Sequence, residues 1–119
     1  MTQRKAWKVL FVVFAAALTS AAQTPRRDVV LDFTLPNGGT PQLRITDGET
    51  GTIELPRAGK FGFVPTLDAD AHSIALEIFD LSKTPNRRID RLELVVGGDT
   101  AQSHTKPPFS IRAERVVPQ

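Results

Sequence analysis

Cysteine is absent from the 119 residues of this sequence, and so is tyrosine. Without cysteine the chain has no disulfide, no thiolate metal site, no cysteine to carry a lipid and no cysteine nucleophile. The single tryptophan, Trp7, lies near the N-terminus, between Lys5 and Lys8. The rest of the chain therefore lacks the Tyr or Trp platform on which carbohydrate-binding domains stack sugars.

The N-terminus has the pattern of a secretory signal. A positive region with Arg4, Lys5 and Lys8 precedes an unbroken apolar run of ten residues, Val9 to Leu18. Ten residues form a helix of about 15 Å, half of a hydrocarbon core of about 30 Å, so a retained anchor is disfavoured. Small residues, Ser20 and Ala22, then predict cleavage before Gln23.

Removing the leader also removes the basic character of the chain. Without Arg4, Lys5 and Lys8, the 15 Lys and Arg residues become 12, against 13 Asp and Glu, which gives a net charge of −1. A nearly neutral domain has no general attraction to polyanions. We therefore expect no nucleic-acid partner and no stable membrane insertion after cleavage.

The remainder shows no helical apolar spacing over even three turns. Apolar and polar residues alternate instead in short segments that end in Gly, Pro, Asn or Asp, the pattern of half-buried strands and turns. The expected strands cover 28–35, 42–46, 50–55, 60–64, 73–81, 91–96 and 109–117, with a short additional strand or loop at 101–103. A change of parity near Ile78 and Phe79 predicts a β-bulge or a strand that changes sheets.

These segments predict an all-β protein with one small antiparallel β-sandwich of about seven strands. We expect an immunoglobulin-like or fibronectin-like arrangement, with a small closed barrel as the alternative. The predicted organisation is a helical signal peptide at 1–22, a flexible tether at 23–27 and the sandwich domain at 28–118.

One triplet has the composition of a metal site. Asp68, Asp70 and His72 recur at every second residue, and in an extended segment this spacing places all three side chains on one face. The alternative is a turn in which aspartate accepts backbone hydrogen bonds before the next strand. No second group of ligands accompanies the triplet, so the turn is favoured and no cofactor is expected.

Catalytic patterns are not evident. Ser103 and His104 are adjacent in sequence, and neighbouring side chains on an extended chain point apart, which is wrong for a nucleophile and its base. We therefore predict that the protein is not an enzyme.

Loop and strand residues late in the chain are candidates for a binding surface. A basic group is formed by Lys83, Arg87, Arg88 and Arg91, and Asp99 lies in a separate glycine turn. The alternative is an ordinary solvated surface with cross-strand ion pairs, because acidic residues lie in the same stretches.

Together these features predict an exported, non-enzymatic binding or structural module that contacts a protein partner. Export without disulfides, and without an Asn-x-Ser/Thr acceptor at Asn37 or Asn86, favours a bacterial periplasm or the outside of the cell. The alternative function is metal binding, or a metal-dependent enzyme, centred on Asp68, Asp70 and His72.

Overall fold

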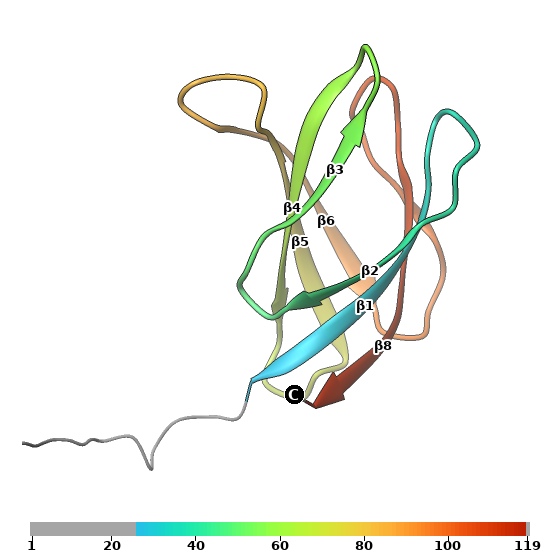
Figure 1. The fold of residues 1–119 in the computed structure, drawn as a ribbon. Coiled ribbons are helices and arrows are strands. Elements are labelled where there is room, and N and C mark those ends of the chain that lie inside the picture. Colours follow the sequence, from blue (N-terminus) through green and yellow to red (C-terminus); the bar gives the residue numbers. More distant parts are fainter. Residues whose placement is uncertain (1–25, 119) are drawn as a thin grey trace, which may run out of the picture.

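A computed structural model describes residues 26–118 of the chain. The predicted signal peptide and the tether up to residue 25 lie outside the described residues. Within them the chain forms eight strands, with no helix, in two antiparallel sheets of four strands each (Figure 1). The all-β, two-sheet prediction is confirmed. The strands are β1 (Arg27–Thr34), β2 (Gln42–Thr46), β3 (Gly51–Leu55), β4 (Gly59–Leu67), β5 (Ser73–Asp80), β6 (Arg87–Val95), β7 (Ala101–Gln102) and β8 (Ser110–Pro118).

The strand order differs from the predicted immunoglobulin-like or fibronectin-like arrangement. The first sheet has the order β2-β1-β8-β7 and the second the order β3-β4-β5-β6. An immunoglobulin sandwich places strands from distant parts of the chain side by side through Greek-key connections. Here every hydrogen-bonded pair joins sequence neighbours, except β1 with β8. The short connections place each strand either next to its successor in the same sheet or opposite it in the other sheet. The chain therefore runs up and down as a meander, which the pairing of β1 with β8 closes.

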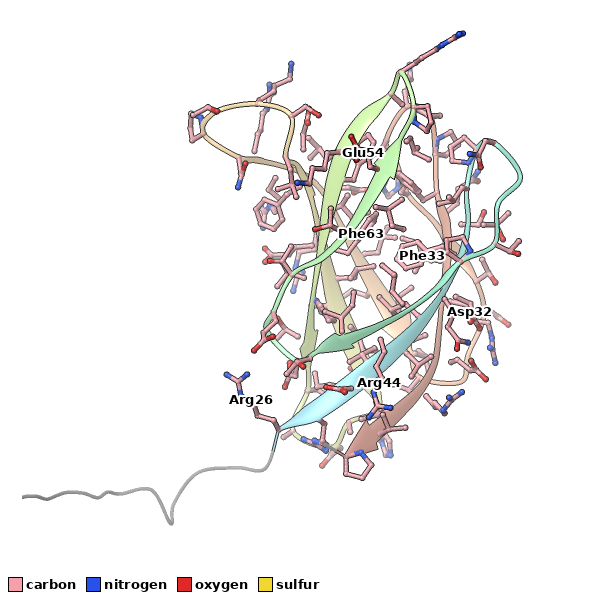
Figure 2. All side chains as sticks on the ribbon, viewed as in Figure 1. Arg26, Asp32, Phe33, Arg44, Glu54 and Phe63 are labelled. Atoms are coloured by element: carbon pink, nitrogen blue, oxygen red, sulfur yellow. The ribbon has the colours of Figure 1, made fainter. Side chains whose placement is uncertain are left out.

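The core fills the space between the sheets with one face of each strand, as the alternation predicts. Phe33 of β1 and Phe63 of β4 lie in this interior, with ring centroids 4.8 Å apart (Figure 2). Phe109, just before β8, packs edge-on against Phe63 at 5.5 Å and against Phe61 at 5.2 Å. Such edge-to-face contacts add to the free energy of burial. This aromatic cluster, Phe33, Phe61, Phe63 and Phe109, joins the two sheets.

Strand β4 runs past the residue at which we predicted its end. Pro65 has no N–H to donate, which normally excludes it from a central strand. The last pair between β3 and β4 is Gly51 with Phe63, so Pro65 lies beyond the end of β3. Its carbonyl accepts a hydrogen bond from Gly48 N–H of the β2–β3 turn at 2.7 Å. Proline is tolerated here because no neighbouring strand needs its missing N–H.

The irregularity predicted near Ile78 and Phe79 is present in the pairing of β5 with β6. Ile78 pairs with Asp90 and Phe79 with Arg88, so Ile89 of β6 is the extra residue of a bulge. Strand β5 itself stays regular against β4. Phe79 therefore follows the ordinary alternation of β5: Ile78 points into the core and Phe79 points to the outer face of the second sheet.

The meander gives the sandwich two distinct ends. Connections after β1, β3, β5 and β7 lie at one end, which we call the distal end (Figure 1). Connections after β2, β4 and β6 lie at the other, which we call the terminal end because Arg27 and Pro118 pair there. The chain enters and leaves the fold at the terminal end.

Replacing Phe63 with Ala is expected to destabilise the fold strongly, because its ring is fully buried and contacts two others. We expect a loss of about 3–5 kcal/mol in unfolding free energy, a large part of the roughly 5–15 kcal/mol typical of a domain. Urea unfolding measures it. Phe79→Ala, on the outer face, is the matched control and costs clearly less. Equal losses would contradict the described core.

Candidate functional site

The structure does not bring Asp68, Asp70 and His72 together as a metal site. Residues 68–72 form a turn rather than an extended segment, and Ala71 has a φ of 58°. Asp68 Oδ1 accepts hydrogen bonds from the N–H groups of His72 at 2.9 Å and Ser73 at 3.3 Å, and its Oδ2 accepts from Ser73 Oγ at 3.0 Å.

The Asp68 carboxylate is thus occupied by its own turn. Desolvation works to raise the pKa of Asp68, but the hydrogen bonds from Ser73 and His72 outweigh it and lower the pKa below 3.8. Across residues 26–118, no three His, Cys, Asp or Glu side chains group closely enough to hold a metal ion. The geometry follows the turn interpretation of this triplet.

The predicted binding-surface residues do not form one surface. Lys83 is exposed in the β5–β6 loop at the distal end, and Arg87 is the exposed first residue of β6. Arg88 pairs with Glu77 at 2.8 Å, and Arg91 pairs with Glu93 at 2.9 Å. Asp99 lies in the β6–β7 turn at the terminal end.

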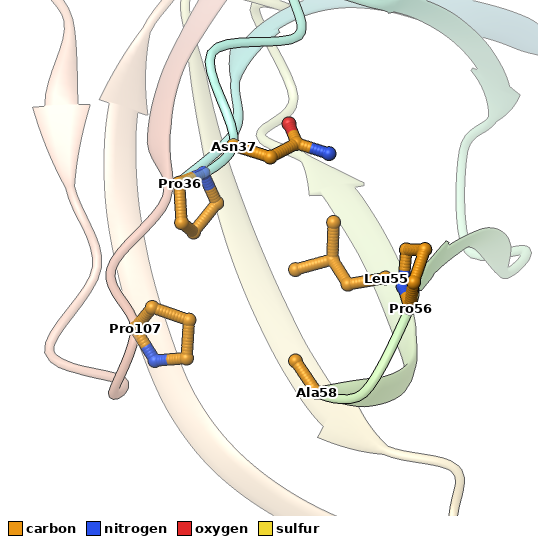
Figure 3. A pocket seen from close by; sticks show the side chains of 6 residues that line it. All are labelled: Pro36, Asn37, Leu55, Pro56, Ala58 and Pro107. Carbon is orange, nitrogen blue, oxygen red and sulfur yellow. The ribbon is translucent and has the colours of Figure 1, made fainter.

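A pocket opens at the distal end (Figure 3). Pro36 and Pro107 lie on one side, with Leu55, Pro56 and Ala58 facing them. The pocket has a volume of about 270 Å³, and its lining is completed by Asn37. Leu55 also belongs to the buried core, with 5% of its surface exposed. The pocket therefore rests on the core, and three prolines restrict the backbone of the loops around it.

Several of the connections at the distal end carry basic residues, and two of these residues are sequence neighbours of the pocket lining. The four distal connections contain Arg57, Lys83, Lys106 and His104, and no Asp or Glu. Arg57 lies between two lining residues of the pocket, and Lys106 directly precedes a third. Lys60 and Arg87, at the ends of adjoining strands, are also exposed, but the ladders place them opposite Glu54 and Asp80.

The terminal end has the opposite character. Its three connections contain no Lys or Arg and carry five acidic residues, Asp47, Glu49, Asp68, Asp70 and Asp99. Arg26, which precedes β1 at this end, forms an ion pair with Glu49. A second open cavity, of about 400 Å³, lies here between β6 and the β6–β7 turn, lined by Val95, Asp99 and their neighbours.

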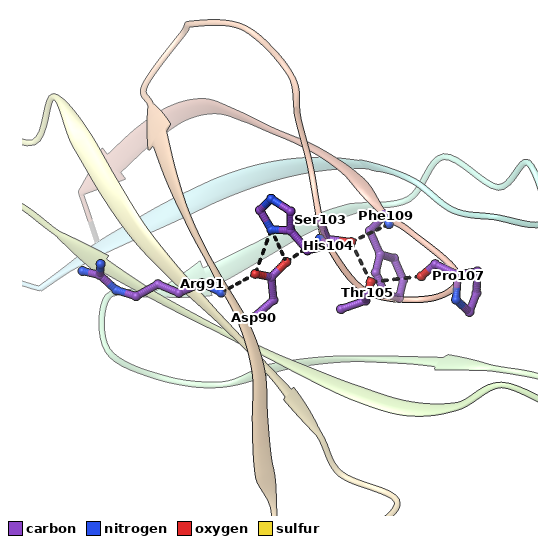
Figure 4. A network of polar contacts seen from close by, with 7 residues as sticks. All are labelled: Asp90, Arg91, Ser103, His104, Thr105, Pro107 and Phe109. Atoms are coloured by element: carbon purple, nitrogen blue, oxygen red, sulfur yellow. Dashed lines mark hydrogen bonds and ion pairs between the residues drawn. The ribbon is translucent and has the colours of Figure 1, made fainter.

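A carboxylate connects the two sheets beside the distal end (Figure 4). Asp90 faces inward from β6, and its side chain is only 9% exposed. Its Oδ2 accepts a hydrogen bond from the His104 N–H at 2.6 Å, and its Oδ1 lies 3.1 Å from His104 Nδ1. Asp90 Oδ1 also accepts from the Arg91 N–H at 2.8 Å. The β7–β8 loop is thereby held against β6.

Internal hydrogen bonds order the rest of the β7–β8 loop. Ser103 Oγ is buried, accepts a hydrogen bond from Phe109 N–H at 2.8 Å and lies 2.6 Å from Thr105 Oγ1. Thr105 Oγ1 donates to the Pro107 carbonyl at 3.0 Å. The Ser103 hydroxyl and the His104 ring thus have separate partners, and Pro107 enters the pocket on a loop fixed at both ends.

The ionisation of Asp90 follows from these contacts. Desolvation alone would raise the pKa of its carboxyl group, but hydrogen bonds from His104 and Arg91 hold the pKa below the ordinary value of 3.8. Asp90 therefore stabilises the fold in its charged form. This contribution is complete above pH 3.8 and is lost as the pH falls through the lower, folded-state pKa.

Comparison of this chain with protein-family models, with curated proteins and with solved structures found no match. In the part of the chain that the structure describes, no helix has the length and apolarity needed to cross a membrane.

Sequence reasoning missed the pocket and the Asp90–His104 contact. The three lining prolines are 20 or more residues apart, and the sequence pattern relates Pro36 and Pro56 only to the ends of their own strands. Asp90 and His104 are 14 residues apart and belong to different sheets. Their contact became visible only with the strand order.

Replacing Asp90 with Asn is expected to lower the unfolding free energy by about 1–2 kcal/mol at pH 7, since it weakens charge-assisted hydrogen bonds. The difference from the unaltered protein shrinks as the pH falls from about 4 through the lower, folded-state pKa, because the carboxyl group is protonated first in the unfolded chain and then in the folded one. Urea unfolding at pH 7, 5 and 3 measures this trend. His104→Ala keeps the backbone N–H and costs less, whereas a larger loss in His104→Ala would contradict the role given to Asp90.

Proposed function

We propose that this chain is an exported, non-enzymatic binding module that makes protein–protein contacts through its distal end. The observation that supports this function best is the apolar pocket between the proline-bearing loops. Loops on a rigid sandwich are common binding surfaces, because the scaffold fixes their positions while their sequences vary.

The size of the pocket indicates what it takes. A volume of about 270 Å³ falls just below the range of about 300–1,000 Å³ typical for small-molecule sites. It suits one apolar side chain, and a single anchor residue in a fixed pocket often supplies much of the affinity between proteins. A protein partner therefore fits the pocket better than a cofactor does.

Export is the second part of the proposal and rests on the sequence of residues 1–22. The basic start, the short apolar run and the small residues before Gln23 are the signs of a cleaved leader. The described fold begins at the terminal end. The pocket is consequently at the end opposite to the point where the chain enters the domain.

Mass analysis of the protein recovered from the exporting cell tests the leader. We expect a mature chain that begins at Gln23, because signal peptidase cuts after small residues at the third and first positions before the site. Substituting Ala22 with a bulky residue such as Phe is expected to block cleavage. Accumulation of a chain that keeps Met1 would contradict export by this route.

Photocrosslinking in the producing cell tests the pocket. A photoreactive amino acid at the exposed pocket residue Ala58 is expected to give a defined protein adduct, because the partner covers this position. Thr52, exposed on the outer face of the second sheet, is the matched control. Adducts from Thr52 alone, or equal adducts from both positions, would contradict a distal binding surface.

A further inference from the structure

We propose that the distal pocket recognises an acidic, extended segment of its protein partner, with one apolar residue flanked by Asp or Glu. This inference rests on the proposed function and specifies the chemistry of the partner. The apolar residue occupies the pocket, and the flanking carboxylates meet the surrounding cations. Both features are needed, because neither a pocket of this size nor a few surface charges confer specificity alone.

The first argument is that the distal cations have no acidic partners of their own. Among the described residues, no ion pair involves Arg57, Lys83 or Lys106, and the distal connections contain no carboxylate. Six arginines elsewhere do pair with Asp or Glu: Arg26, Arg44, Arg88, Arg91, Arg112 and Arg115. The charge at the distal end is therefore available to an incoming acid.

The second argument comes from Asn37, the polar side chain among the lining residues. Its Oδ1 already accepts a hydrogen bond from Gly39 N–H at 2.9 Å. The side-chain nitrogen takes no part in that bond and carries two N–H donors. Donors and cations together match a ligand rich in acceptors, such as carboxylates and peptide carbonyls.

The third argument concerns the backbone at Arg57. This residue has a φ of 68°, in the left-handed region that glycine adopts much more readily than arginine. Strained backbone conformations are frequent at binding and catalytic sites, where function offsets their cost. An arginine held here, between two residues that line the pocket, indicates that the side chain is used.

The charge distribution favours a protein segment over a polyanion. The terminal connections carry five acidic residues, and Arg26 and Arg27 at the same end offset only part of their charge, so the molecule is polarised along its length with its basic end distal. Nucleic acids and anionic lipid surfaces require an extended basic face, whereas here two cations, Arg57 and Lys106, adjoin the residues that line one apolar pocket. A segment with an apolar residue between carboxylates would contact both the pocket and the cations beside it.

Titration with synthetic peptides, followed by amide chemical shifts of the mature domain, tests the proposal. The probes are Asp-Asp-Leu-Asp-Asp, Asp-Asp-Ser-Asp-Asp and Lys-Lys-Leu-Lys-Lys, each with blocked ends. We expect the first to shift the amides of Asn37, Leu55, Arg57 and Ala58, and those at 104–106. The serine peptide binds about tenfold more weakly or worse, because it loses one buried apolar side chain. The lysine peptide does not bind.

Two variants separate charge from packing. Arg57→Gly removes a cation and relieves the backbone, so it is expected to fold at least as stably while binding the acidic leucine peptide about 2- to 5-fold more weakly. Lys106→Gln is expected to weaken binding by a similar factor. Arg91→Gln, which removes the same charge from the outer face of the second sheet, leaves the affinity unchanged. Added salt weakens binding to the unaltered protein more than binding to Arg57→Gly.

The outcomes distinguish failure of the acidic-segment proposal from failure of the proposed protein-binding function. Preference of the pocket for the lysine peptide, or equal binding of all three, would overturn the acidic inference and leave a protein-binding pocket in place. Binding of heparin or anionic vesicles that shifts only the cationic residues would assign the end to a polyanion and overturn it as well. Salt-sensitive self-association in which the acidic end of a second copy shifts the pocket amides would also overturn it. No shift at the pocket with any probe, together with crosslinks only from Thr52, would reject both proposals.

Discussion

The edge-to-face packing of four phenylalanine rings is the constraint on which the rest of this structure depends. Phe33 of one sheet contacts Phe63 of the other, and Phe109, just before β8, contacts both Phe63 and Phe61. The rings fix the spacing of the sheets near the distal end, where Leu55 belongs both to the core and to the pocket. A binding surface at this end is rigid because it is built directly on the packed core. In a domain without disulfides, this packing takes the place of covalent restraint.

Much of the fold could be predicted from the sequence, because half-buried strands impose a period of two on their residues. Strand β2 was predicted with its observed bounds. Strand β4 was predicted too short because proline was judged without its neighbours. The strand order could not be predicted, for a related reason: alternation identifies the buried face of a strand but not the strand beside it.

The site was harder to predict than the fold, because it is made by residues that meet only after the sheets form. Lys83 was selected for its charge, but its membership of a common end with Arg57 and Lys106 depends on the meander. Asp68 shows the opposite error, since a ligand-like spacing in sequence becomes a turn that uses the carboxylate internally. Local sequence patterns identified residues with suitable chemistry, whereas only the strand topology shows which of them lie close together.

The pairing of β1 with β8 has a consequence for how the chain could be rewired. Arg27 lies opposite Pro118, so the two ends of the fold meet side by side. All other ladders form between neighbours in sequence, which leaves this one as the only ladder whose closure must enclose nearly the whole described chain. A circular permutant that joins these ends through a short linker, with new termini at Asp99 in the exposed β6–β7 turn, which connects strands of different sheets, would convert that distant closure into a hairpin. It would leave every other hairpin intact and is expected to reach the same fold faster.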